Sequence, residues 1–306
     1  MFEIKGKVST ALCYANVVED EAIEQIRRMC DYEFTAGSEI RIMPDVHAGK
    51  GCTIGTTMTI TDKVVPNIVG VDIGCGMYTV ELGKVDIDFE RVDEAAHFIP
   101  SGHNTWEGRL ERFDLTGLRC YRSLKLTKRL EKSLGTLGGG NHFIEIDASA
   151  DGTKYLVIHS GSRNLGKQVA EIYQALAVDL NMGKEELFKK QDELIRSYKV
   201  KGRRSEIDAA LKALKKEWKA NEPTIPPDLC YVYGKYMEDY LHDVEICQRF
   251  AKRSRERMAE ILLARTDMQA LSAFHTIHNY ISTDEMILRK GAIAAREGEP
   301  LLIPIN

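Results

Sequence analysis

The sequence lacks the cysteine pattern of a disulfide-stabilised protein. Its seven cysteines are an odd number, and no CysXXCys pair occurs among them. Small secreted domains that depend on disulfides carry an even number of regularly spaced cysteines. We therefore expect reduced thiols and a cytoplasmic protein.

A long uninterrupted hydrophobic run is also missing. The most apolar stretch, Val64 to Val80, is broken by Pro66, Asp72 and three glycines, so it cannot form a membrane-spanning helix. The N-terminus carries Glu3 and Lys5 where a signal peptide needs an apolar segment. The sequence predicts neither a membrane partner nor a secretion signal.

An excess of positive charge is absent as well. The 42 Lys and Arg residues are outnumbered by 46 Asp and Glu residues, which gives a net charge of -4. A uniformly basic nucleic-acid coat protein is thereby excluded. Any contact with RNA must come from a local patch, because phosphate neutralisation needs positive charge only where the backbone lies.

Of the 306 residues, 43% are hydrophobic, enough for a substantial core. Short β-branched segments between Gly and Pro predict a sheet-rich region from Ile4 to Leu82, interrupted by a helix over Glu21–Tyr32. Strand-like runs follow at 143–146 and 155–158. From Gly166 onward the pattern becomes helical, and it ends in a long helix from about Val232 to Ala264. The sequence therefore predicts one α/β domain, with a mixed sheet core and surrounding helices.

Residues 184–222 form a Lys- and Glu-dense segment with two helical patterns. Ser205 and Asp208 are placed to cap the second helix, and Pro223 and Pro226–Pro227 end the segment. We interpret it as a helical hairpin inserted in the α/β domain. Such charge patterns more commonly indicate a solvated amphipathic hairpin with a structural or interface role. The alternative interpretation is an arm that contacts a polyanion.

Candidate metal ligands stand in loops bounded by Gly or Pro. The loops contain Asp45, His47 and Lys50 (43–52), Asp72 and Cys75 (69–77), His142 (137–143), and His159 with Arg163 (159–166). His275 and His278 form a further pair, which their spacing of three places on one face of a predicted helix. His97, His103 and His242 have no comparable context and are interpreted as structural or surface residues.

Each of these residues alone also has an ordinary structural interpretation, for example a buried thiol for Cys75 or a turn for Asp72. Together, one thiolate, one carboxylate and several imidazoles can surround one or two divalent cations, with the sulfur as a bridge. The softness of these ligands favours zinc. The triple glycine at 138–140 and Arg163 suit a phosphate. The residues thus predict a metal and phosphate site at strand ends, and they predict no reaction.

Six motifs between Ile42 and Ala292 nevertheless resemble one family in sequence and order. They are MetProAspValHisAlaGlyLysGly (43–51), ValGlyValAspIleGlyCysGlyMet (69–77), LeuGlyGlyGlyAsnHisPheIleGlu (137–145), HisSerGlySerArgAsnLeuGly (159–166), HisAsnTyr (278–280) and ArgLysGlyAla (289–292). This set closely resembles the RtcB-type RNA ligases, the tRNA-splicing ligase family.

The resemblance implies an unusual α/β fold with a central sheet core and an RNA ligase activity. Such enzymes join an RNA 3′-phosphate or 2′,3′-cyclic phosphate to a 5′-hydroxyl, using GTP, two Mn²⁺ ions and a histidine–GMP intermediate. The implied substrates are tRNA halves or damaged RNA. Manganese is thus implied by the resemblance, with Zn²⁺ as a substitute that the ligand types favour.

The resemblance also implies roles for individual residues. Cys75 would bridge the two ions, His142 and His159 would complete one site, and Asp72 and His278 would complete the other. The remaining roles fall on residues around the metals: guanylate contacts by Asn141, Glu145 and Asn279, an RNA phosphate contact by Arg163, and support behind the ligands by Asp45 and His47.

One part of the family pattern is missing. The guanylated histidine belongs to a later HisGlyAlaGly motif, and no histidine follows His278 in this sequence. A C-terminal lysine that helps to read guanine is missing too, and the last seven residues, Pro300–Asn306, form an apolar, strand-like run. We therefore expect residues 1–306 to form a single catalytic domain that is incomplete at its C-terminus and has no catalytic histidine. The alternatives are a metal-dependent RNA-end phosphoesterase and a non-catalytic metal- or RNA-binding module.

Overall fold

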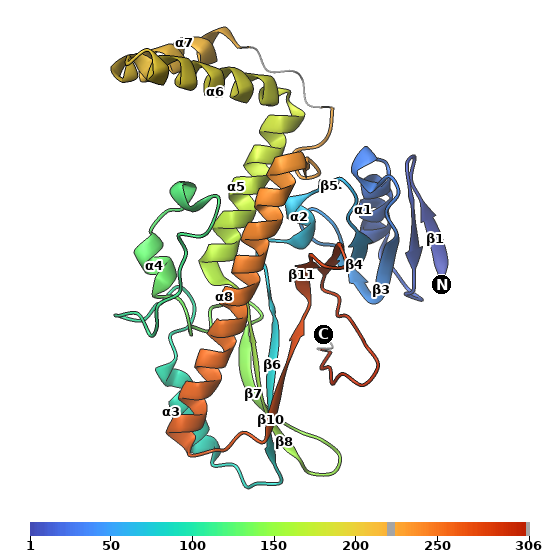
Figure 1. The fold of residues 1–306 in the computed structure, drawn as a ribbon. Coiled ribbons are helices and arrows are strands. Elements are labelled where there is room, and N and C mark those ends of the chain that lie inside the picture. Colours follow the sequence, from blue (N-terminus) through green and yellow to red (C-terminus); the bar gives the residue numbers. More distant parts are fainter. Residues whose placement is uncertain (219–223, 304–306) are drawn as a thin grey trace.

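The computed structural model describes residues 1–218 and 224–303. It is a mixed α/β fold with several sheets and surrounding helices, as the sequence predicts. Figure 1 shows two separate sheets, with the long helices α5 (Arg163–Asn181) and α8 (Gly234–Thr266) beside one another. In the described residues, no helix is both long enough and apolar enough to cross a membrane.

The first sheet has six strands and contains the N-terminal residues. Its order is β1 (Phe2–Lys5), β2 (Thr10–Cys13), β3 (Ile40–His47), β4 (Ile54–Thr59), β12 (Ile287–Lys290) and β11 (Asn279–Ser282). Only β2 and β3 pair in parallel. The helix α1 (Asp20–Cys30) packs on β1 and β2 through Ala22, Ile26 and Met29, which share one helical face. The predicted helix at 21–32 is therefore confirmed.

The second sheet has four antiparallel strands, and one end of it adjoins Cys75, His142 and His278. Its order is β10 (Ser272–Ile277), β6 (Gly76–Gly83), β8 (Lys154–Ser160) and β7 (Phe143–Ala148). The strands expected at 143–146 and 155–158 are confirmed as β7 and β8. Helix α8 packs on β6 and β8, and α3 (Phe89–Phe98) packs on α8.

Short elements connect these layers. They are η1 (Glu33–Thr35), β5 (Lys63–Val64), α2 (Pro66–Val69), η2 (Tyr121–Ser123), α4 (Thr127–Glu131) and β9 (Val232–Tyr233). β5 pairs with β9. The long C-terminal helix α8 begins at Gly234, directly after β9.

Two helices occupy the segment expected to form a hairpin. They are α6 (Lys184–Val200) and α7 (Ile207–Glu217), joined through the short helix η3 (Arg204–Glu206). The expected cap is wrong, because Glu206 precedes α7 and no side chain caps it. Residues 219–222 of the expected hairpin and Pro223 lie outside the described residues. The division of the chain into domains stays a prediction.

Two further expectations are corrected by the structure. The segment around His275 is the strand β10, so His275 and His278 do not share a helical face. The spacing of three residues fits a helix, but the pairing of all six residues of β10 with β6 makes the segment a strand. The apolar C-terminal run is not a strand over 300–303, and residues 304–306 lie outside the described part.

Candidate metal centre

Strand pairing brings together five potential ligands that lie far apart in the sequence. Cys75 immediately precedes β6, His159 lies in β8, and His142 immediately precedes β7. In the sheet, His159 is opposite Met77 on one side and opposite Phe143 on the other. The pairing of Ile277 with Gly76 brings His278 to the same end.

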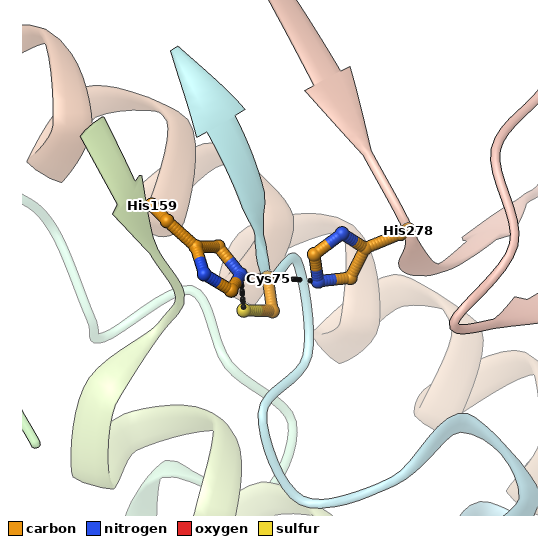
Figure 2. Close-up of side chains that lie close together, drawn as sticks. All are labelled: Cys75, His159 and His278. Carbon is orange, nitrogen blue, oxygen red and sulfur yellow. Dashed lines mark hydrogen bonds between the residues drawn. The ribbon is translucent and has the colours of Figure 1, made fainter. Parts of the chain in front are cut away.

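The ligand atoms form two groups of three that share the Cys75 sulfur. One group contains Cys75, His159 and His278, and the other contains Asp72, Cys75 and His142; within each group the atoms lie within 4.8 Å of one another. Figure 2 shows the first group, in which the sulfur lies 3.3 Å from Nε2 of His159. In the second group, Nε2 of His142 is 2.8 Å from Oδ2 of Asp72 and 3.6 Å from the sulfur.

Backbone carbonyls fix the orientation of two of the imidazoles. Nδ1 of His142 lies 3.0 Å from the carbonyl oxygen of Leu137, and Nδ1 of His159 lies 2.9 Å from that of Asn141. A carbonyl can only accept, so each Nδ1 donates its proton to the backbone and each Nε2 points into the cluster. This is the arrangement by which proteins orient metal-binding histidines.

The donor set fits divalent cations. Nε2 of His159 and Nε2 of His278 face each other at 3.3 Å. Burial lowers the pKa of His159 to about 4 and the pKa of His278 to about 3, and neighbouring histidines add to both effects. Both rings are therefore neutral at pH 7. A cation between such lone pairs satisfies them, and thiolate, imidazole and carboxylate are zinc or manganese ligands.

Neighbouring groups reinforce the effect of burial on the pKa of Cys75 and oppose it at Asp72. Burial raises the pKa of the Cys75 thiol, and the nearby charge of Asp72 raises it further. Burial would also raise the pKa of Asp72, but the hydrogen bond and charge of His142 outweigh it and leave the pKa lowered. Because metals bind the thiolate, metal binding at Cys75 must release a proton.

Arg255 of α8 holds the backbone next to two of the ligands. The sequence interpretation missed this residue. Its side chain is fully buried in α8. Its Nη1 donates to the carbonyl oxygens of Gly74 at 2.8 Å and Ser160 at 2.7 Å. These residues adjoin Cys75 and His159, so one guanidinium connects two ligand-bearing strand ends. Burial lowers its pKa to about 10, which leaves the cation intact at neutral pH.

A cleft of about 540 Å³ opens beside the ligands. Asp72 and His142 line it together with the cationic side chains of Arg129, Arg163 and Lys167. Gly139 and Gly140 of the triple glycine line it too. A cleft with cations, glycine backbone and a metal-competent edge suits a phosphate-containing ligand.

Arg163 is held at the wall of this cleft by an uncommon backbone conformation. Its φ angle is +59°, where few residues other than glycine are found. Its Nη2 donates to the carbonyl oxygen of Gly102 at 2.8 Å, and its Nε donates to Oγ1 of Thr136 at 3.2 Å. A Cβ at Gly138 would lie 1.6 Å from Nη1 of Arg163, so the glycine leaves the space that the guanidinium fills.

The family model of the tRNA-splicing ligase RtcB matches residues 25–116 and 106–306 of the chain. The chain belongs to the RtcB family. The RNA-splicing ligase RtcB of Escherichia coli K12 is 28% identical over 330 aligned residues, which cover 94% of this chain and 72% of that protein. The tRNA-splicing ligase RtcB of Archaeoglobus fulgidus is 29% identical over 212 residues, which cover 50% of this chain and 43% of that protein.

All five ligands expected from the RtcB resemblance meet in one cluster, but the structure groups them differently. The resemblance combines His142 with His159 and Asp72 with His278, whereas the structure combines Asp72 with His142 and His159 with His278. Cys75 belongs to both groups in either arrangement. The assignment of ligands to individual ions therefore stays a prediction.

The residues expected to contact guanylate are dispersed around the cluster. Asn141 lines the cleft. Glu145 is exposed on β7, where partial burial and Asp147 raise its pKa. Oδ1 of Asn279 accepts a 2.8 Å hydrogen bond from the backbone N–H of Gly291. Their role in nucleotide binding stays a prediction for this RtcB-family chain.

Asp45 and His47 lie at the end of β3. Asp45 is exposed, and its carbonyl oxygen lies 3.0 Å from Nδ1 of His47. Among the described residues, no hydrogen bond or ion pair joins either of them to the five ligands. His103, which the sequence interpretation treated as a surface residue, lines the cleft. His103 follows Gly102 directly, and no other metal-competent residue stands beside it to mark it in the sequence.

Proposed function

We propose that this chain provides the metal and phosphate site of an RNA ligase that joins 3′-phosphate or 2′,3′-cyclic phosphate ends to 5′-hydroxyl ends. The proposal rests above all on one observation: two donor groups share Cys75, and Asp72 and His142 of one group line a cleft with three cationic side chains. Such a site can hold a terminal RNA phosphate or a nucleoside triphosphate next to two cations. The RtcB relatives, which carry the name of RNA-splicing ligases, support this reaction class.

Two Mn²⁺ ions are the proposed occupants, held by Asp72 and His142 on one side and His159 and His278 on the other, with Cys75 between them. Bound cations would supply neutralisation of phosphate oxygens and of the leaving group. Zn²⁺ suits the same ligands on grounds of softness.

Arg163 and Asn141 are proposed to position the phosphates. Nε and Nη2 of Arg163 already donate hydrogen bonds to protein acceptors, so the side chain reaches the cleft in a fixed orientation. Burial lowers its pKa without removing the charge. Fixing the phosphate before reaction lowers the entropic part of the barrier, because an in-line displacement requires close alignment of the two oxygens.

GTP is the proposed energy source, with Asn141, Glu145 and Asn279 at the guanylate. The 306 residues contain no HisGlyAlaGly segment. A direct test is to incubate the chain with α-labelled GTP and Mn²⁺ and to look for label on the protein. Covalent label would show that a nucleophilic side chain within these residues accepts GMP. Metal-dependent GTP binding without label would restrict the chain to the binding steps.

A phosphoesterase is the second candidate, because the described cluster needs no covalent histidine to hold a phosphate between cations. An RNA with a 2′,3′-cyclic phosphate and an RNA with a 5′-hydroxyl distinguish the candidates. Joined product that requires GTP supports the ligase. Hydrolysis of the cyclic phosphate without GTP, abolished in Cys75→Ala, supports the phosphoesterase. Binding of the RNA without turnover supports a metal- or RNA-binding module. The RNA substrates in the cell and a cytoplasmic location stay predictions.

A further inference from the structure

The hairpin of α6 and α7 separates its charges along its length. Residues 184–217 contain eleven Lys and Arg and seven Asp and Glu, a net charge of +4 in a chain of net charge -4. Five of the cations fall between Glu193 and Glu206, a stretch without any acidic residue. We call residues 196–204 the basic tip; its cations are Arg196, Lys199, Lys201, Arg203 and Arg204, all exposed.

The ion pairs of the hairpin lie mainly at its base. Lys189 pairs with Glu185 at 3.1 Å, and Lys190 pairs with Glu186 at 2.8 Å. At the basic tip, Arg203 pairs with Glu206. Within residues 1–218 and 224–303, the other four cations of the tip form no ion pair. A hairpin stabilised only by exposed ion pairs would show the same pairing along its whole length, and this one does not.

Helix dipoles explain only part of the positive charge at the basic tip. Lys199 lies in the last turn of α6, where a cation is favourable. Arg203 and Arg204 lie just before α7, where the helix dipole favours acidic residues instead. The ion pair with Glu206 offsets this for Arg203, but Arg204 has no ion pair among the described residues, and an external anion explains its charge better than folding does.

The hairpin stands away from the rest of the molecule. Only Leu187 is buried in α6, and no residue of α7 is buried. Figure 1 shows the hairpin projecting from the far end of α5, whose other end begins at Arg163 beside the cleft. An α-helix of 19 residues is about 28 Å long, so the tip lies on the order of 30 Å or more from the cleft.

We propose that the basic tip binds the phosphate backbone of the RNA whose end occupies the cleft. This inference rests on the proposed function, which supplies the RNA. A rigid pair of helices with four unpaired cations neutralises phosphates without reading bases. Because of the distance, the tip contacts the body of a long RNA and never its reacting end. The ring of Tyr198, with Arg203 5.1 Å from its centroid, adds an aromatic surface at the same place.

The experiment compares two RNAs that carry a 3′-phosphate. The first is a trinucleotide, on the order of 10 Å long at roughly 3.4 Å per phosphate, which is too short to reach the tip from the cleft. The second is a stem-loop of about 20 base pairs, which is long enough to reach the tip. The tip variant is Arg196→Gln, Lys199→Gln, Lys201→Gln and Arg204→Gln in the 306-residue chain. A control removes four other exposed cations through Lys5→Gln, Lys7→Gln, Arg27→Gln and Lys84→Gln, with the same change in net charge. Circular dichroism checks that all variants are folded.

Fluorescence anisotropy at several salt concentrations gives the affinity and its salt dependence. The tip variant should bind the stem-loop about tenfold or more weakly, and its slope of log K against log salt should be smaller by about 2 to 4. Its affinity for the trinucleotide should match that of the wild type, and the control variant should behave as the wild type with both RNAs.

Other outcomes separate the two proposals. Equal affinity and slope of wild type and tip variant for the stem-loop would overturn the role of the tip, while the proposed function would stand. An equal loss in the control variant would also overturn it, because net charge alone would then explain the effect. Unchanged RNA binding with lost binding to phosphatidylserine vesicles would assign the tip to a membrane surface instead. Failure of the wild type to bind the trinucleotide at all would count against the proposed function itself.

Discussion

Removal of the Cys75 sulfur should weaken both metal sites at once, because this atom belongs to both donor groups. A four-ligand zinc site contributes about 10–16 kcal/mol, or about 3 kcal/mol for each ligand. A loss of about 3 kcal/mol corresponds to a factor of about one hundred in affinity. Cys75→Ala should therefore weaken zinc binding about a hundredfold at each of two sites, as measured by calorimetric titration of the metal-free protein.

The matched control is Cys13→Ala. Cys13 is a buried free cysteine in β2, outside the cluster. Loss of one buried sulfur costs about 1–2 kcal/mol of folding stability in either variant, so stability alone cannot explain a difference in metal binding. Two tight sites in Cys75→Ala, with the affinity of the wild type, would refute the bridging position of the sulfur.

Double variants distinguish the two possible groupings. In the grouping seen in the structure, Asp72→Ala with His142→Ala removes two ligands from one ion and leaves the other site intact. Asp72→Ala with His278→Ala removes one ligand from each site. The first variant should bind one ion with wild-type affinity, and the second should bind two ions weakly. The reverse result would favour the grouping that the family resemblance implies.

Three further predictions concern the surroundings of the cluster. Gly161→Ala would place its Cβ 2.1 Å from Oδ1 of Asp72, so it should weaken one metal site by calorimetry and spare the other. Asp243→Ala should lower the free energy of unfolding in urea by about 3–5 kcal/mol, because this buried carboxylate accepts from the backbone N–H groups of Arg119 and Cys120 and from the hydroxyl of Tyr173; Tyr173→Phe should cost only about 1 kcal/mol. Burial, with Arg255 and Lys252 nearby, lowers the pKa of His275 from 6.5 to about 3. As the pH drops below about 6.5, the unfolded chain takes up a proton at this histidine before the folded chain does, so the free energy of unfolding falls. Urea titrations at several pH values should show a smaller fall in His275→Phe.

Local motifs predicted the residues that meet in the cluster, because most of them lie beside a strand end in a glycine-containing segment; their role as metal ligands stays a prediction. Cys75 adjoins Gly74 and Gly76, and His142 and His159 each lie two residues from a glycine; the strands beside them were expected from β-branched runs. What the motifs did not contain was the register that brings the strands together. The pairing of His159 with Met77 joins residues 82 positions apart in the sequence, and no local pattern encodes it.

The missed and mistaken elements have the same origin in tertiary packing. Arg255 lies on the buried stripe of α8 with Ala251, Met258 and Leu262, and a charged residue on an apolar stripe was the available signal. The sequence between His275 and His278 fits either helix or strand. The adjacent edge of β6 decided between them, through six paired residues.

The position of Arg255 explains why the ligand cluster can be preformed. The guanidinium donates hydrogen bonds to the carbonyl oxygens of Gly74 and Ser160, and these hold the backbone next to Cys75 and His159. The backbone carbonyls of Leu137 and Asn141 set the imidazoles of His142 and His159 in turn. Each of these contacts is made by the protein alone, so the ligand orientation does not depend on a bound ion. The same buried cation offsets the charge of Asp72 and of a Cys75 thiolate, which lowers the cost of gathering two anions in a site that must also accept phosphate.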